Sequence, residues 1–181
     1  MNIKRFRTIC RISSFVLKLL AVFSVIIVVY GLYTIYFDDG NFWFTYNKPT
    51  GAIYSMTKIT DGAMITQADR RLAALIIVPF TLLVNFYTLF KGAQIFEWLG
   101  NGEAPFSEKF AKSLRRISLV LIISDLVIPI VHSLVLSFIY KGGYEIIIGI
   151  GSMFFIGIIL YVISEIFYYG IELQHLANET V

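Results

Sequence analysis

The sequence predicts an all-α membrane protein in which four transmembrane helices form two hairpins. Hydrophobic residues make up 57% of the 181 residues and only 15% are charged. Soluble domains carry about 25% charged residues, so this composition is typical of a chain in contact with lipid. The apolar residues also gather in long runs. A run of about 20 apolar residues crosses a bilayer as a helix, so the chain is expected to form a single membrane domain.

Four apolar runs are the expected spans, and they cover residues 12–37, 72–90, 117–139 and 146–167. The segments around them are an outer loop at 38–71, a linker at 91–116, a tight glycine turn at 140–145 and a tail at 168–181. The first run is longer than the apolar region of a signal peptide, and no small-residue cleavage site follows it. We therefore interpret it as a retained span.

The basic residues predict the orientation of the spans. Most of them lie before or just inside the first span or in the linker, although Arg70 and Arg71 at the outer end of the second span oppose this bias. Because cytoplasmic segments carry an excess of Lys and Arg, both termini are expected in the cytosol. The net charge of +3 is interpreted as contact with anionic lipid, and direct binding of nucleic acid is not expected.

The linker is expected to turn at its glycines and then to begin a helix at the N-cap Ser107. Phe106 and Phe110 begin an apolar stripe on this helix, and Lys112, Arg115 and Arg116 lie beside the stripe. A basic amphipathic helix of this kind suits the anionic face of a membrane. The helix continues without a break into the third span.

Polar side chains within the spans are the candidate intramembrane site, because they are costly in lipid and usually have a role there. They are Asn85, Asp125, His132 and Glu165. Two interpretations stay open: a proton or cation path lined by several of them, or hydrogen bonds between helices that hold the bundle together. No known catalytic motif is present, so no catalytic residue, cofactor or metal site is expected, and we expect no enzymatic activity.

The outer loop is rich in aromatic residues. Its segment NFWFTYN alternates in a way that favours a strand, and AIYSMTKI could complete a β-hairpin with it. The alternative is a belt of aromatic side chains at the membrane interface.

Two stretches carry a resemblance to a known family. The central GEAPFSEKFAKSLRRI and the closing EIFYYGIELQHLANETV resemble a bacterial membrane-protein family, the domain of unknown function DUF2975. The chain departs from the family pattern at Phe110 and at Ala177–Glu179. The resemblance implies four spans in the bacterial inner membrane, no attached biochemical activity, and small helix-turn-helix regulators as expected partners.

We therefore expect a non-enzymatic regulatory or accessory protein, a membrane partner of a small cytosolic helix-turn-helix regulator. The expected partner surface lies within 106–116 and 171–181, and its residues are Phe106, Phe110, Lys112, Arg115, Arg116, Glu172 and Leu173. Two alternatives remain: a small transporter or bacteriocin-immunity-type protein that uses Asp125 and His132, and an envelope sensor that uses the outer loop. Whether the chain forms a homo-oligomer stays open.

Overall fold

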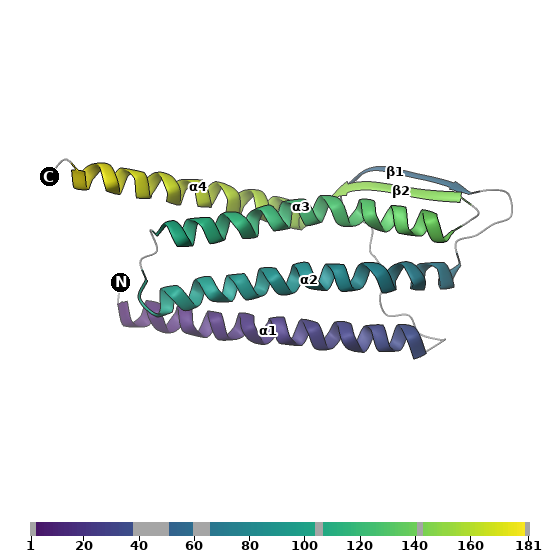
Figure 1. The fold of residues 1–181 in the computed structure, drawn as a ribbon, viewed down its shortest axis with the longest axis horizontal. Helices are drawn as coiled ribbons and strands as arrows, with labels where there is room; N and C mark the ends of the chain where they lie inside the picture. Colours follow the sequence, from purple (N-terminus) through teal and green to yellow (C-terminus); the bar gives the residue numbers. More distant parts are fainter. Residues whose placement is uncertain (1–2, 38–50, 60–65, 104–106, 141–142, 180–181) are drawn as a thin grey trace.

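A computed structural model describes residues 3–37, 51–59, 66–103, 107–140 and 143–179. These residues form the helices α1 (Ile3–Phe37), α2 (Gln67–Gly100), α3 (Glu108–Ile139) and α4 (Ser152–Glu179), and the strands β1 (Gly51–Ile59) and β2 (Gly143–Ile150). Figure 1 shows their arrangement. All four helices are long and apolar enough to cross a membrane. The predicted four-helix membrane fold is confirmed.

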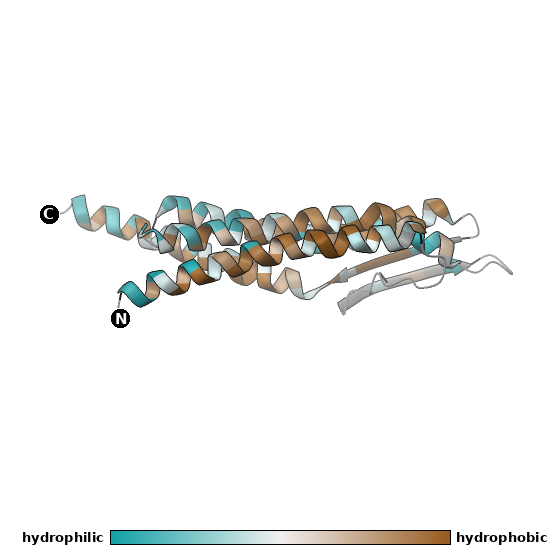
Figure 2. Cartoon of the chain, turned by 90° about the horizontal axis from the view of Figure 1, so that it is seen from below, coloured by the Kyte–Doolittle hydropathy of each residue, from teal (hydrophilic) through white to brown (hydrophobic). Residues whose placement is uncertain are grey.

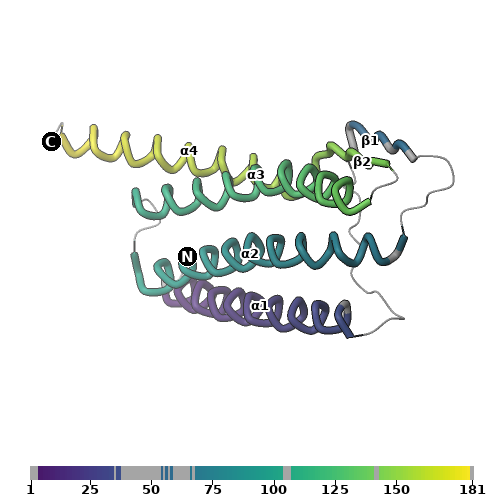
Figure 3. The backbone as a smooth tube through the Cα atoms, turned by 45° about the vertical axis from the view of Figure 1, so that its right-hand side comes forward, coloured from purple at the N-terminus to yellow at the C-terminus, as the bar shows by residue number. Residues whose placement is uncertain are grey.

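The helices form two antiparallel hairpins, one of α1 with α2 and one of α3 with α4, and the hairpins meet along α2 and α3. Both chain termini and the α2–α3 turn lie at one end of the molecule, called here the terminal end (Figures 1 and 3). The two strands lie toward the opposite end, called the strand end. Hydrophilic residues gather toward the termini, while hydrophobic residues cover the middle of the bundle (Figure 2).

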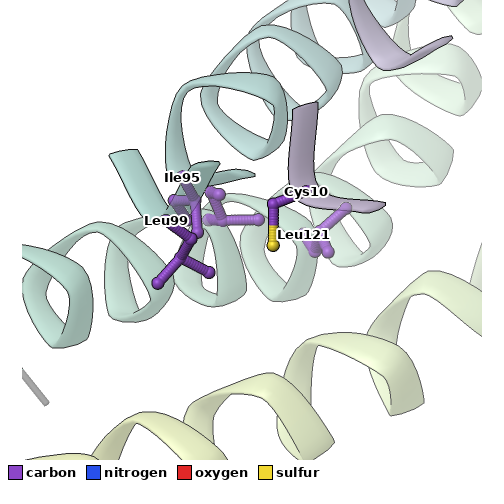
Figure 4. Close-up of a cluster of buried hydrophobic side chains, with 5 residues drawn as sticks. Cys10, Ile95, Leu99 and Leu121 are labelled. Carbon is purple, nitrogen blue, oxygen red and sulfur yellow. The ribbon is translucent and has the colours of Figure 1, made fainter. Parts of the chain in front are cut away.

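A cluster of buried apolar side chains joins the two hairpins at the terminal end. It consists of Cys10, Ile95, Leu99, Ile117 and Leu121, of which Figure 4 labels four. Many apolar side chains elsewhere are exposed on the outside of the helices. This is the expected distribution when the solvent around the helices is lipid, since lipid tails are as apolar as leucine.

The linker between the hairpins is shorter than its expected bounds of 91–116, because α2 continues to Gly100. Helix α3 begins as expected, with the Ser107 side chain accepting a hydrogen bond from the backbone N–H of Phe110 at 3.3 Å. The turn between them contains Gly102, whose φ of +91° favours glycine. A Cβ atom there would also lie 2.6 Å from Nη2 of Arg7 on α1.

The expected start of the fourth span at Ile146 is wrong, because residues 143–150 form the strand β2 and α4 begins at Ser152. Strand β2 pairs antiparallel with β1, which belongs to the segment between α1 and α2, and Met56 lies opposite Ile146. Part of the expected outer hairpin is therefore a strand, but its partner within the described residues is β2. The segment 41–47 lies outside the described residues.

Candidate functional site

Strand β2 lies along the half of α3 nearer the strand end, and two serines of α3 bind its free edge. Ser133 Oγ accepts a hydrogen bond from the backbone N–H of Ile147 at 2.9 Å. Ser137 Oγ accepts one from the backbone N–H of Glu145 at 3.3 Å. Four residues of a helix advance about 6 Å and two residues of a strand about 6.6 Å. Two alternate N–H groups of β2 can therefore donate to side chains on two successive turns of α3.

Asp125, near the middle of α3, binds the beginning of α4 in the same way. Its Oδ2 accepts hydrogen bonds from the backbone N–H groups of Gly151 at 2.6 Å and Phe154 at 3.2 Å. A carboxylate at this position caps a helix and balances the positive end of the helix dipole. A Cβ atom on Gly151 would lie 2.6 Å from Oδ1 of Asp125, so the close approach requires glycine.

These contacts have a consequence for the position of the chain in a bilayer. Helix α4 begins beside Asp125, so α4 covers one half of α3 and β2 covers the other half (Figure 1). Non-helical backbone is tolerated at membrane depth only where the protein satisfies its polar groups. Asp125, Ser133 and Ser137 supply those partners from one helix, which makes α3 the support for both segments.

A cavity of about 450 Å³ lies between the two hairpins. Helix α2 provides most of its wall, and α1, α3 and α4 each add one or two residues. The lining residues are Ser24, Val28, Ala74, Ile77, Val78, Thr81, Leu82, Asn85, Thr88, Leu89, Leu121, His132 and Met153. Cavities of about 300 to 1,000 Å³ with mainly apolar walls and a few polar groups are typical of small-molecule sites.

The polar groups of the cavity follow one face of α2. Thr81, Asn85 and Thr88 line it at intervals of one helical turn. Both threonine hydroxyls donate to carbonyls in the preceding turn, at 2.9 Å to Ile77 O and 2.8 Å to Val84 O, so their lone pairs remain available as acceptors. Within the described part of the chain, the Asn85 amide has no hydrogen-bond partner.

The four predicted intramembrane residues do not line one cavity. Asn85 and His132 share the cavity between the hairpins, whereas Asp125 caps α4. Glu165 lies farther toward the terminal end, where its Oε1 is 3.6 Å from Nε of Arg115. No group of His, Cys, Asp and Glu side chains among the described residues is arranged to hold a metal ion.

A second hollow, a groove of about 540 Å³, lies at the terminal end between α3 and α4. Its lining combines carboxylates, aromatic rings and one imidazole, from Glu108, Glu165, Tyr168, Tyr169, Ile171, Glu172 and His175. The last turns of α4 project beyond the other helices (Figures 1 and 3). Apolar side chains on these turns are exposed, Tyr169 by 63% and Leu176 by 54%.

Two residues of the predicted partner surface, Phe110 and Arg115, contact α4 instead of lying free on the outside. Phe106 lies outside the described residues. Phe110 packs its ring against Phe167, with the centroids 4.9 Å apart, and so contributes to the contact between α3 and α4. Arg115, besides approaching Glu165, donates from Nη2 to the Tyr161 hydroxyl at 3.1 Å.

The other predicted surface residues lie on the outside of the terminal end. Lys112 forms an ion pair with Glu108 one turn earlier in α3. Arg116 and Glu172 are exposed, and Leu173 is 48% exposed. Glu172 forms no ion pair with any residue that the structure describes.

Sequence reasoning missed the hydroxyl residues that carry much of this arrangement. Ser133 and Ser137 are four residues apart in an apolar run, as are Thr81 and Asn85. Such a spacing places two polar groups on one helix face, and this signal was available in the sequence. Tyr169 was missed as well, because the predicted partner surface begins at residue 171; His175 lies within that surface but was not singled out.

One family model matches the chain. It is described as "Protein of unknown function (DUF2975)", and it matches residues 55–181. The match includes the second half of β1, all of β2 and α2 to α4, and therefore the groove and most of the cavity wall. No curated protein matches the chain, and neither does any solved structure.

Proposed function

The chain belongs to the DUF2975 family, and we propose that it is a non-enzymatic accessory membrane protein that binds a soluble protein at its terminal end. The observation that carries the proposal is the end of α4. Its last turns project beyond the rest of the bundle (Figure 1) and present exposed Tyr169, Leu173 and Leu176 beside a groove. Exposed apolar side chains that lie beyond the spans, rimmed by polar groups, are typical of a protein-binding surface.

The proposed orientation places this surface in the cytosol. The terminal end carries the basic residues of α1 and of the start of α3 (Lys4, Arg5, Arg7, Arg11, Lys109, Lys112, Arg115 and Arg116). An excess of Lys and Arg favours the cytoplasmic side, and the family resemblance adds a bacterial inner membrane.

A labelling experiment tests this orientation in intact cells. In a Cys10→Ala background, a membrane-impermeant maleimide should modify a cysteine at Lys58, an exposed residue toward the strand end of β1, and not one at Gln174, which should react only after lysis. The reverse pattern would overturn the proposed orientation.

The chemistry of the groove favours a partner with a basic, partly apolar helix. Three glutamates line it, and Glu172 is free of ion pairs within the described residues. An unpaired carboxylate beside tyrosine rings can bind Lys or Arg both by charge and through the aromatic face. DNA-binding helices are basic, so a small helix-turn-helix regulator, the partner that the resemblance implies, fits this surface.

Crosslinking from the projecting helix tests the proposed partner. A photoreactive amino acid at Tyr169 should capture a helix-turn-helix protein in cells, and Glu172→Lys should reduce the yield several-fold. Gln174→Lys is the matched control, because residue 174 lies on the opposite face of α4 from Leu176 by helical periodicity. The proposal fails if no such regulator is captured, or if the two lysine variants lose capture equally.

A further inference from the structure

The cavity between the hairpins is elongated along α2. Its lining runs along α2 from Ala74 to Leu89, a distance of about 22 Å at 1.5 Å per residue. An extended hydrocarbon chain fits a hollow of this length, whereas a compact ring system would leave most of it unfilled.

Among the described residues, the cavity walls have no acidic or basic side chain other than His132, and most of them are apolar. A ligand with a full charge would lose its hydration there without gaining a counter-ion, which is costly. The Asn85 amide offers both donors and an acceptor, and the Thr81 and Thr88 hydroxyls can accept in addition. The walls therefore fit a neutral molecule with a hydrocarbon chain and a hydroxyl or ester group.

The position of Asn85 indicates where such a molecule would come from. Asn85 lies near the middle of the long apolar helix α2 and is exposed, so its amide is accessible at the depth of the hydrocarbon. An amide without a partner at this depth costs free energy. A hydroxyl group from a bound lipid would satisfy it, whereas plain acyl chains beside it would not.

We propose that this cavity binds one neutral long-chain lipid from the bilayer, of the class of long-chain alcohols and monoacylglycerols, with its hydroxyl group hydrogen-bonded to Asn85. The chain of the lipid lies along α2 against Ile77, Val78 and Leu82, which line the same wall. The proposal goes beyond the binding of a soluble partner and does not depend on it, because no described residue lines both the cavity and the groove.

Photolabelling of the full chain tests the proposal in phosphatidylcholine vesicles. The probe is hexadecanol with a diazirine in its chain, and unlabelled monoolein is the competitor. Labelling should saturate, and monoolein should abolish it. Peptide mapping should find the label on α2 or α3 at the cavity. Asn85→Leu, which removes the hydrogen bond, should weaken binding about tenfold, and Thr81→Phe should block the chain path.

Leu83→Phe is the matched control, because residue 83 lies on the same helix and its side chain is 65% exposed. This variant should bind the probe as the parent protein does. The thermal unfolding midpoint and elution volume of each variant report whether it folds. Thr81→Phe supplies a second measurement if Asn85→Leu does not fold.

Two results would overturn the proposal. If labelling rises linearly with probe concentration and is equal in all variants, the cavity holds ordinary bilayer lipid without selection. If a diazirine-bearing palmitate labels the cavity as strongly as the alcohol at about pH 10, where the fatty acid is ionised even in a bilayer, the site does not select neutral ligands. Saturable labelling that is lost in both cavity variants and kept in Leu83→Phe supports it.

Discussion

Ser133 of α3 accepts a hydrogen bond from the backbone N–H of Ile147 in β2 at 2.9 Å. The same hydroxyl donates to the carbonyl of Pro129 at 2.9 Å, so one side chain satisfies two backbone groups. Ser133 is only 3% exposed, which leaves no room for water to replace it. A helix side chain thus accepts the hydrogen bond that the carbonyl of a neighbouring strand would otherwise accept at the edge of β2.

Replacing Ser133 with alanine should loosen β2 and destabilise the fold. The variant leaves the buried N–H of Ile147 without a partner, a loss of about 1 to 3 kcal/mol. Hydrogen exchange at Ile147 should become faster, and the thermal unfolding midpoint in detergent should fall. Ser113→Ala is the control, because Ser113 lies in the same helix and makes no side-chain hydrogen bond within the described residues. Equal effects of the two variants would contradict the role assigned to Ser133.

Asp125 is expected to act as a helix cap and not as a proton carrier. Asp125→Asn keeps an acceptor oxygen for the Gly151 and Phe154 N–H groups, so stability should change little. Asp125→Ala removes the cap and should cost about 1 to 2 kcal/mol. Thermal unfolding of the two purified variants measures the difference. A fully folded Asp125→Asn protein that loses an ion or proton flux of the parent would favour the transport interpretation instead.

Gly157 sets the distance between α3 and α4. A Cβ atom at this position would lie 2.7 Å from Cγ1 of Ile122 and 3.0 Å from the backbone oxygen of Ser118. Gly157→Ala should therefore push the helices apart and destabilise the protein by about 1 to 3 kcal/mol.

The matched control for Gly157 is Gly92→Ala, because a Cβ atom there would meet only Cδ1 of Leu17 at 3.6 Å. Alanine favours a helix interior over glycine by about 1 kcal/mol, so this variant should be neutral or more stable. Chemical unfolding of both variants in detergent decides the comparison. If Gly157→Ala is as stable as the parent, the close contact between α3 and α4 is not required.

The sequence was sufficient to predict the helices, because long apolar runs and glycine turns are local signals. The Ser107 N-cap was predicted for the same reason, since a cap depends only on the residues that follow it. Glu165 and Arg115 were each placed near the inner membrane boundary, but their contact depends on how α3 packs on α4. No local pattern specifies that packing.

The strand β2 could not be predicted by the same reasoning. Its apolar run, YEIIIGI, continues into the apolar start of α4, and a short buried strand cannot be told from a helix by periodicity. Contacts with α3 decide where the strand ends and the helix begins. Asp125 accepts a hydrogen bond from the N–H of Gly151, and α4 begins at the next residue. Ser133 and Ser137 accept hydrogen bonds from the segment before it. The role of Asp125 as a cap could not be predicted either, because it depends on the packing of α4 against α3.

The pairing of β1 with β2 predicts a specific disulfide. Met56 and Ile146 are opposite each other, and their side chains are 41% and 39% exposed. Directly opposed residues have Cβ atoms about 4.5 to 5.5 Å apart, while diagonal neighbours are about 7 to 8 Å apart. A disulfide needs about 3.5 to 4.5 Å, so only the opposed pair can form it with a small backbone adjustment.

The double variant Met56→Cys/Ile146→Cys, in a Cys10→Ala background, should therefore oxidise readily in membranes. The diagonal pair Met56→Cys/Ile148→Cys is the control and should oxidise several-fold more slowly. Protection of the thiols from a maleimide-linked polymer, read as a shift on a gel and reversed by reductant, measures both. If the diagonal pair closes as fast as the opposed pair, the register is different. If neither pair closes, β1 and β2 do not form a sheet when the protein is in the membrane.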